Sequence, residues 1–284
     1  MSNKTIELIN GVKIPTLGFG TWCIEGKKAT DAVKCAIEVG YRHIDTAQAY
    51  GNEAEVADGI LASGVDRNDL FVVSKVAAEH KTYELAAQSI NQTLHKMKSD
   101  HLDMMIIHSP QPWAEWRGKK RYFEENIEVW RALEDAYRNG KLRAIGVSNF
   151  LEDDLDNILS HCGVKPAVNQ VLAHIGNMPF DLINKCQKEG IAVEAYSPIA
   201  HGEALKNPTI AKIAQNYGVS AAQLCIKYVL QHGLIALPKA STLEHIKQNA
   251  ELNFDISASD MSALDGLDFS DYGQYSYFPV FSGK

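Results

Sequence analysis

The sequence predicts an α/β fold, a (β/α)8 TIM barrel whose bottom is closed by an N-terminal β-hairpin. Eight short runs of apolar and β-branched residues alternate with stretches of helical periodicity, which is typical of a parallel sheet that closes on itself. An open doubly wound sheet would carry a glycine fingerprint directly after a strand. The candidate segment, GFGTWC at 18–23, lacks the third glycine, so the barrel is favoured.

The hairpin is predicted at the start of the chain. The segments IEL and VKI flank Asn10-Gly11, the dipeptide that most strongly signals a two-residue turn. The eight barrel strands are then expected at 17–20, 41–44, 70–75, 102–108, 143–148, 167–171, 191–197 and 234–238.

The stretches between the strands predict helices with recognisable ends. Thr30 is expected to cap the first helix and Gly40 to end it, and Thr82 is expected to cap another. Further helices are predicted at 127–139, 179–189 and 210–233, the last restarting at Ser220. Because no linker-like Pro/Gly/Ser segment interrupts this alternation, residues 1–284 are expected to form one domain.

The composition limits the classes of function. A net charge of −7 argues against a nucleic-acid partner or an anionic membrane surface. The five cysteines are an odd number and contain no CxxC pair, which disfavours disulfides and a structural zinc site; no metal is expected. The N-terminus lacks the apolar stretch of a signal peptide and no segment reaches membrane-spanning length, so a cytoplasmic protein is expected.

Polar side chains recur where the predicted strands end. In a barrel of this kind the carboxyl ends of all strands meet at one rim, and that rim carries the chemistry. One such residue would be ordinary strand-end polarity, but seven of the eight strands supply one. The residues concerned are Asp45, Lys75, His108, Ser148 with Asn149, Gln170, Tyr196 with Ser197, and Lys239.

Four residues at this rim predict a proton donor. Lys75 ends an apolar strand and needs a partner, which Asp45 on the neighbouring strand can supply. Tyr50 lies in the loop just beyond Asp45, and an adjacent cation is expected to lower its pKa so that it can protonate a developing alkoxide. His108 can donate a hydrogen bond that orients a substrate carbonyl. Carbonyl reduction needs these groups, together with a hydride source from a cofactor.

Several motifs then support a resemblance. GVKIPTLGFGTW, GYRHIDTAQAYGNE, LDMMIIHSP, RAIGVSNF, EAYSPIAHG and LPKASTLEHIKQN occur in this order along the chain. Over roughly residues 5–270 the chain resembles the aldo-keto reductases, and is similar to the bacterial branch that includes diketogluconate and methylglyoxal reductases. The resemblance implies a barrel that binds NADPH across its carboxyl-end rim and reduces aldehydes or ketones: small carbonyls, dicarbonyls or keto-sugars. It also implies a monomer.

The resemblance implies a role for each site residue. Tyr50 would be the proton donor, Lys75 and Asp45 its tuning pair, and His108 the group that orients the substrate. Trp22 would help to wall the substrate pocket. Ser148, Asn149 and Gln170 would hold the nicotinamide carboxamide while Tyr196 stacks on its ring. The remaining cofactor residues would be Ser197, Pro198 and Ile199 along the pyrophosphate, and Lys239, Ser241, Thr242, His245, Gln248 and Asn249 at the adenosine end.

The chain departs from the family pattern at the adenosine end. His245 stands where NADPH users usually have arginine, Gln248 replaces a usual glutamate, and Ala240 a usual serine. A neutral imidazole grips a 2′-phosphate less firmly than a planar guanidinium does. Lys239 remains as a point charge for the phosphate. We therefore expect a preference for NADPH with tolerance of NADH.

The substrate pocket also departs from the pattern. Ser109 occupies a position where many relatives have tryptophan, so it is expected to contact substrate and to widen the mouth. Trp113 and Trp116 in the following loop either refill that space or serve only in packing. The aromatic C-terminal segment at 272–284 would close over the pocket in this family, whereas a loosely packed terminus is the alternative.

Two other functions compete with carbonyl reduction. Lys75 at a strand end could instead form a Schiff base in a barrel aldolase, although a nearby Asp45 would hold its proton in place. Some relatives of this fold are sensors or structural proteins, so a non-catalytic NADP(H)-binding protein is the other alternative.

Overall fold

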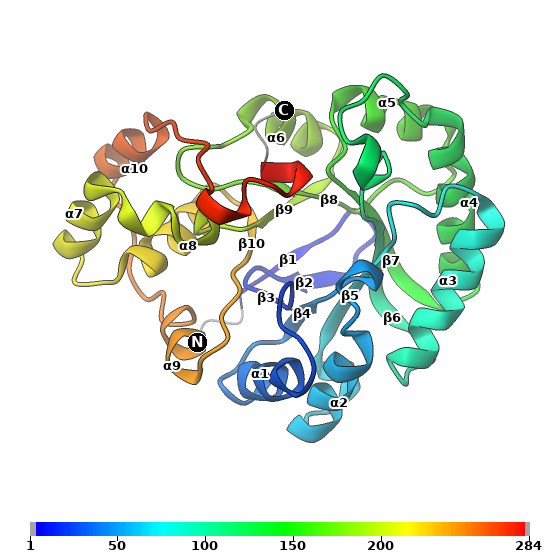
Figure 1. Ribbon diagram of the computed structural model, residues 1–284, viewed down its shortest axis with the longest axis horizontal. Coiled ribbons are helices and arrows are strands. Elements are labelled where there is room, and N and C mark those ends of the chain that lie inside the picture. The colour runs from blue at the N-terminus through cyan, green and yellow to red at the C-terminus, as the bar shows by residue number, and fades with distance from the viewer. Residues whose placement is uncertain (1–3, 282–284) are drawn as a thin grey trace.

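Eight parallel strands form a barrel in the described part of the chain, in the same order in space as in sequence (Figure 1). The computed structural model describes residues 4–281. Leu17 and Ala236 form a parallel bridge that joins the first and last strands and closes the sheet. The predicted barrel is confirmed, with strands β3 (Phe19–Gly20), β4 (His43–Asp45), β5 (Phe71–Val76), β6 (Leu102–Ile107), β7 (Leu142–Ser148), β8 (Val168–Leu172), β9 (Ala192–Tyr196) and β10 (Ile235–Leu237).

Helices surround the barrel and bury their apolar faces against it (Figure 1). Thr82 is an N-cap as predicted, because its hydroxyl accepts a hydrogen bond from the Leu85 N–H. Ser220, where the last helical stretch was predicted to restart, caps α8 by accepting from the Gln223 N–H. The helices are α1 (Lys27–Glu38), α2 (Glu53–Ser63), α3 (Tyr83–Lys96), α4 (Phe123–Arg138), α5 (Glu152–His161), α6 (Phe180–Lys188), α7 (Pro208–Asn216), α8 (Ala221–Gln231), α9 (Leu243–Gln248) and α10 (Ala258–Asp265).

The predicted cap at Thr30 is wrong. Helix α1 begins at Lys27, directly after Gly26, whose φ of 52° only glycine adopts easily. Thr30 therefore lies inside the helix, where its hydroxyl donates to the backbone carbonyl of Glu55 on α2 at 3.0 Å. The two helices approach closely because residue 59 is glycine: a Cβ there would lie 2.7 Å from the Thr30 carbonyl oxygen.

The N-terminal hairpin consists of β1 (Thr5–Glu7) and β2 (Lys13–Pro15), and its turn differs from the two-residue prediction. The Gly11 N–H donates to the Leu8 carbonyl and the Leu8 N–H donates to the Val12 carbonyl, both at 2.8 Å. Gly11 takes a φ of 83°. This is a four-residue turn, residues 8–11, whose last residue is a left-handed glycine, a common hairpin connection in which only one residue needs positive φ.

The barrel interior is apolar at the bottom and polar at the top. Leu8 and Ile14 of the hairpin are buried and pack with Phe71, Met104 and Ile106 from the strands, so the predicted closure of the bottom is confirmed. Leu8 and Ile14 thus form an apolar plug. The buried polar side chains of the barrel lie above this plug; they include His43, Asp45, Lys75, Gln170 and Glu194. The hairpin thus excludes water from one end and leaves the carboxyl ends of the strands as the open end.

Candidate active site

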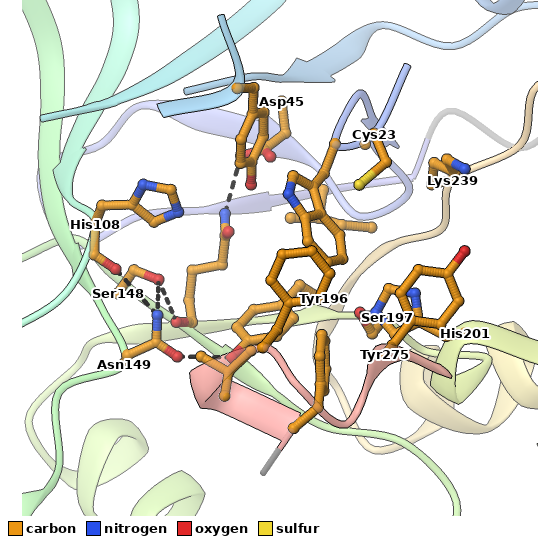
Figure 2. Close-up of a pocket in the computed structure, with 18 of the residues that line it drawn as sticks. Cys23, Asp45, His108, Ser148, Asn149, Tyr196, Ser197, His201, Lys239 and Tyr275 are labelled. Atoms are coloured by element: carbon orange, nitrogen blue, oxygen red, sulfur yellow. Dashed lines mark hydrogen bonds between the residues drawn. The ribbon is translucent and has the colours of Figure 1, made fainter. Parts of the chain in front are cut away.

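A cavity of about 470 Å³ lies at the carboxyl ends of the strands. Figure 2 shows polar side chains from several strand ends pointing into it. Of the rim residues predicted from the sequence, only Lys75 does not line the cavity, because it is buried beneath Tyr50. Those that line it are Asp45, His108, Ser148, Asn149, Gln170, Tyr196, Ser197 and Lys239.

Lys75 is the centre of the site. Its side chain is fully buried, and its ammonium donates to Asp45 Oδ1 at 2.6 Å, to the Thr46 carbonyl at 2.9 Å and to Tyr50 Oη at 3.2 Å. These three acceptors match the three N–H groups of an ammonium. The predicted contact among Asp45, Lys75 and Tyr50 therefore exists, and it holds the phenol in one place.

The expected direction of the Tyr50 pKa is wrong. Burial raises the pKa of Tyr50 well above its ordinary value of 10, and the charges of Asp45 and then Cys23 add to this shift. A neighbouring cation alone would lower this pKa, but the charge of Lys75 is already paired with Asp45 at 2.6 Å. Tyr50 is consequently a protonated phenol at neutral pH.

His108 stands beside this phenol as a neutral imidazole. Burial and the charge of Lys75 lower the pKa of His108 well below 6.5. Its ring centroid lies 5.6 Å from that of Tyr50 and 5.1 Å from that of Trp113. Among the described residues its Nδ1 atom has no hydrogen-bond partner. A neutral ring beside Tyr50 can donate one hydrogen bond to an oxygen in the cavity.

One wall of the cavity is a hydrogen-bonded set of amides and hydroxyls. Asn149, which has a φ of 62°, donates to the His108 carbonyl and to Ser148 Oγ, both at 3.0 Å, and accepts from Tyr196 Oη at 2.7 Å (Figure 2). Gln170 Nε2 donates to Asp45 Oδ2 at 3.0 Å. Since the nitrogen of this amide points toward carboxylates, its oxygen is left for a ligand in the cavity. Such a wall fits a nicotinamide carboxamide.

The opposite wall is aromatic. Trp22 lies against Phe278 of the C-terminal segment, with ring centroids 4.8 Å apart. Residues 275 and 278–281 line the cavity, so the tail closes over the pocket as the resemblance implied; 282–284 lie outside the described residues. Trp113 also lines the cavity, whereas Trp116 packs behind it at 5.5 Å. Of the two alternatives for this loop, Trp113 refills the mouth and Trp116 serves in packing.

The substrate contact expected at Ser109 is wrong. Ser109 is fully buried and does not line the cavity. Its hydroxyl accepts a hydrogen bond from the Gln111 N–H at 3.3 Å, and its carbonyl accepts one from Lys81 at 2.9 Å. The residue turns the chain away from the rim, and the loop beyond it brings Trp113 back.

The residues predicted for the adenosine end lie mostly outside the cavity. Lys239 lines it, but Ser241 and His245 are exposed on the segment that leads into and through α9. Thr242 caps this helix by accepting from the His245 N–H at 3.3 Å. Gln248 Nε2 donates to Glu244 at 3.2 Å, and the Asn249 side chain is buried. The structure brings these residues together on one short helix beyond Lys239.

Several residues of the site were missed from the sequence. Asn52 has no role predicted from the sequence, yet it is buried and donates to the Thr21 and Ile24 carbonyls at 3.0 and 2.9 Å. It therefore fixes the loop that carries Trp22. Glu194 was also missed, although a carboxylate inside the apolar run IAVEAYS signals a buried polar contact.

A buried lysine, aspartate and histidine beside a partly buried tyrosine at the mouth of a parallel barrel define a carbonyl reductase site. A model of the "Aldo/keto reductase family" matches residues 16–268. The chain is 40% identical to glyoxal reductase of Bacillus subtilis over 93% of its length and 92% of the relative's. It is 37% identical to morphine 6-dehydrogenase of Pseudomonas putida over 93% and 90%.

Solved structures similar to this chain belong to the same family. An aldo/keto reductase from Brucella melitensis superposes with a TM-score of 0.88 at 35% identity, covering 94% of this chain and all of that one. An aldo-keto reductase solved in complex with NADPH gives 0.84 at 32% identity, covering 94% and 88%. The chain belongs to the aldo/keto reductase family. It is an NADPH-dependent oxidoreductase that reduces carbonyl groups. Within residues 4–281 there is no helix of the length and apolarity needed to cross a membrane.

The buried ion pair generates a stability prediction. Lys75→Met leaves Asp45 buried without its cation, and it should lower the free energy of unfolding by about 3–5 kcal/mol in a denaturant titration. Adding Asp45→Asn to Lys75→Met should recover a large part of this loss. The matched control is Lys27→Met, which breaks an exposed pair with Asp31 and should change little. A Lys75→Met loss no larger than that of the control would contradict the buried pair.

Proposed function

We propose that the cavity binds an aldehyde or ketone with its oxygen between Tyr50 Oη and the ring of His108, and that Tyr50 protonates this oxygen. NADPH, when bound, supplies the hydride. The observation that carries the proposal is the contact between a protonated Tyr50 and the buried Lys75, 3.2 Å apart. His108 contributes a hydrogen bond that orients the carbonyl.

The proton transfer follows from the charges around Tyr50. As the substrate carbon is reduced, negative charge develops on its oxygen, and a phenol is a strong enough acid to protonate an alkoxide. The negative charge then passes to Tyr50 Oη, where Lys75 already donates a hydrogen bond. Because Lys75 is held in place before the reaction, it stabilises this charge without reorganisation. Asp45 accepts a hydrogen bond from the lysine and keeps it oriented toward Tyr50.

We propose that the cofactor lies along the amide wall toward α9. The free amide oxygen of Gln170, the hydroxyl of Ser148 and the neighbouring Asn149 support binding of the nicotinamide carboxamide, with Tyr196 against the ring. The remaining proposed contacts are Ser197, Pro198 and Ile199 for the pyrophosphate, and Lys239, Ser241, Thr242, His245, Gln248 and Asn249 for the adenosine end.

The proposed substrates are small aldehydes, dicarbonyls and keto-sugars. Trp22 and Trp113 line the cavity and suit small substrates, and the likeness to a glyoxal reductase supports dicarbonyls. We further propose that residues 1–284 act as a single-domain monomer in the cytoplasm. All five cysteines are free thiols, which supports a reducing compartment.

The geometry argues against a Schiff-base aldolase. A nucleophilic lysine needs a free lone pair and access to substrate. Lys75 has neither, because its ammonium donates to three oxygens and is buried beneath Tyr50.

Tyr50→Phe tests the proposed proton donor. The variant keeps the ring but loses the hydroxyl, so kcat for NADPH-dependent reduction should fall by about 10²–10⁴-fold across a panel of aldehydes, dicarbonyls and keto-sugars. Tyr277→Phe is the matched control, since Tyr277 is exposed and does not line the cavity. Near-full activity of Tyr50→Phe would overturn the mechanism, and an inactive wild-type protein on the whole panel would favour the non-catalytic alternative.

His245→Arg tests the cofactor prediction. With an exposed imidazole of His245 in place of a guanidinium at the proposed 2′-phosphate contact, the kcat/KM preference of the wild type for NADPH over NADH should stay below roughly a thousandfold, about 4 kcal/mol. His245→Arg should increase the preference by about tenfold, because a guanidinium binds phosphate through two parallel hydrogen bonds. Lys247→Arg, on the same helix, is the control. A wild-type preference above this limit would contradict the predicted tolerance of NADH.

A further inference from the structure

Glu194 is a carboxyl group buried inside the barrel below the cavity. It comes from the middle of β9 and is fully inaccessible to solvent. Its Oε2 accepts a hydrogen bond from Gln170 Nε2 at 2.7 Å. Its Oε1 faces His43 Nε2 at 3.6 Å, and within the described residues neither of these two atoms has a hydrogen-bond partner. Two unpaired polar atoms that face each other in a dry interior need an explanation.

The surroundings of His43 show which hydrogen-bond donor is missing from its contact with Glu194. His43 Nδ1 lies 3.2 Å from the Pro15 carbonyl oxygen, which can only accept, so Nδ1 carries the hydrogen. Burial lowers the pKa of His43 to about 4, so the ring is neutral and Nε2 is a bare acceptor. An ionised Glu194 would therefore place an acceptor against an acceptor. A proton on Glu194 Oε1 supplies the donor that the contact lacks.

The charges around Glu194 favour this proton. Burial raises the pKa of Glu194 to about 8, and the charge of Asp45 adds to the effect, whereas the Gln170 hydrogen bond and Lys75 oppose it. The groups that face it are His43 and Asp45 on β4, Lys75 on β5 and Gln170 on β8. Asp103, on β6, acts electrostatically on His43 and is the smallest of the effects on its pKa. Glu194 and Asp45 share Gln170 Nε2, so a second negative charge here would repel the first.

We propose that Glu194 is a positioning residue for carbonyl reduction, which as a neutral carboxylic acid orients the Gln170 amide and whose ionisation suppresses the reaction. With both Asp45 Oδ2 and Glu194 Oε2 accepting from its nitrogen, Gln170 turns its oxygen toward the cavity. With Glu194 neutral, Lys75 is paired with Asp45 and is not neutralised by a second carboxylate. Its positive charge can then stabilise the negative charge that develops on Tyr50. This role rests on the proposed function of Tyr50.

The test compares two substitutions that differ in hydrogen bonding. Glu194→Gln keeps an oxygen that accepts from Gln170 and gains an amide N–H that can donate to His43, so it copies the neutral acid but cannot ionise. Glu194→Leu is of similar size and offers neither contact. We would measure kcat and kcat/KM for NADPH-dependent aldehyde reduction from pH 6 to about pH 10 for the wild type and both variants, and the affinity for NADPH by fluorescence.

The wild type should lose activity through a transition near pH 8. Glu194→Gln should keep wild-type activity at pH 7 to within about threefold and should lack this transition, whereas Glu194→Leu should lose about tenfold and bind NADPH more weakly. Two results would overturn the inference: an unchanged alkaline transition in Glu194→Gln, or an activity of Glu194→Gln at pH 7 as low as that of Glu194→Leu. If Glu194→Leu does not fold, the presence or absence of the alkaline transition in Glu194→Gln still tests the inference.

Tyr50→Phe in the same assay separates this inference from the proposed function. An active Tyr50→Phe would overturn the proton-donor role whatever the profiles of the Glu194 variants. An inactive Tyr50→Phe together with a Glu194→Gln variant that keeps the alkaline transition would overturn the role of Glu194 alone.

Discussion

The pairing of Lys75 with Asp45 is the interaction on which the rest of the site depends. An ammonium buried inside a barrel is tolerated only where a carboxylate and further oxygens receive its hydrogen bonds. Adjacent strands β4 and β5 bring these groups together at 2.6 Å, and Tyr50 takes the remaining N–H. The position of the phenol is therefore a consequence of satisfying the lysine. The same pair extends through Gln170 to the wall proposed for the cofactor.

The division of the barrel interior makes this pairing effective. The plug of Leu8 and Ile14 keeps water from the bottom, so the polar groups above it interact in a dry environment where charge and hydrogen bonding act strongly. Between plug and cavity lies a layer in which His43 and Glu194 are both held neutral. From the bottom of the barrel to its open end, the interior side chains are therefore first apolar, then polar and neutral, and finally charged. Chemistry is confined to the open end.

The fold and the rim residues were predictable, because alternating strands and helices have few solutions and strand ends of a barrel must converge. The start of α1 was not, since Gly26 carries no capping side chain. The raised pKa of Tyr50 could not be predicted, because its burial depends on side chains such as Lys75 and His108 that meet it only in three dimensions. Ser109 was assigned to substrate because the direction of a side chain in a loop cannot be read from a strand pattern.

Tyr50 stays protonated because it is partly buried beside a lysine whose charge is already paired with Asp45. The most direct measurement is ultraviolet titration of tyrosine ionisation in the wild type and in Tyr50→Phe, from pH 7 to about pH 11. The difference between the two curves reports Tyr50. We expect the two curves to coincide up to pH 10, the ordinary pKa of tyrosine. An additional tyrosine that ionises below pH 10 in the wild type, and is absent from Tyr50→Phe, would contradict it.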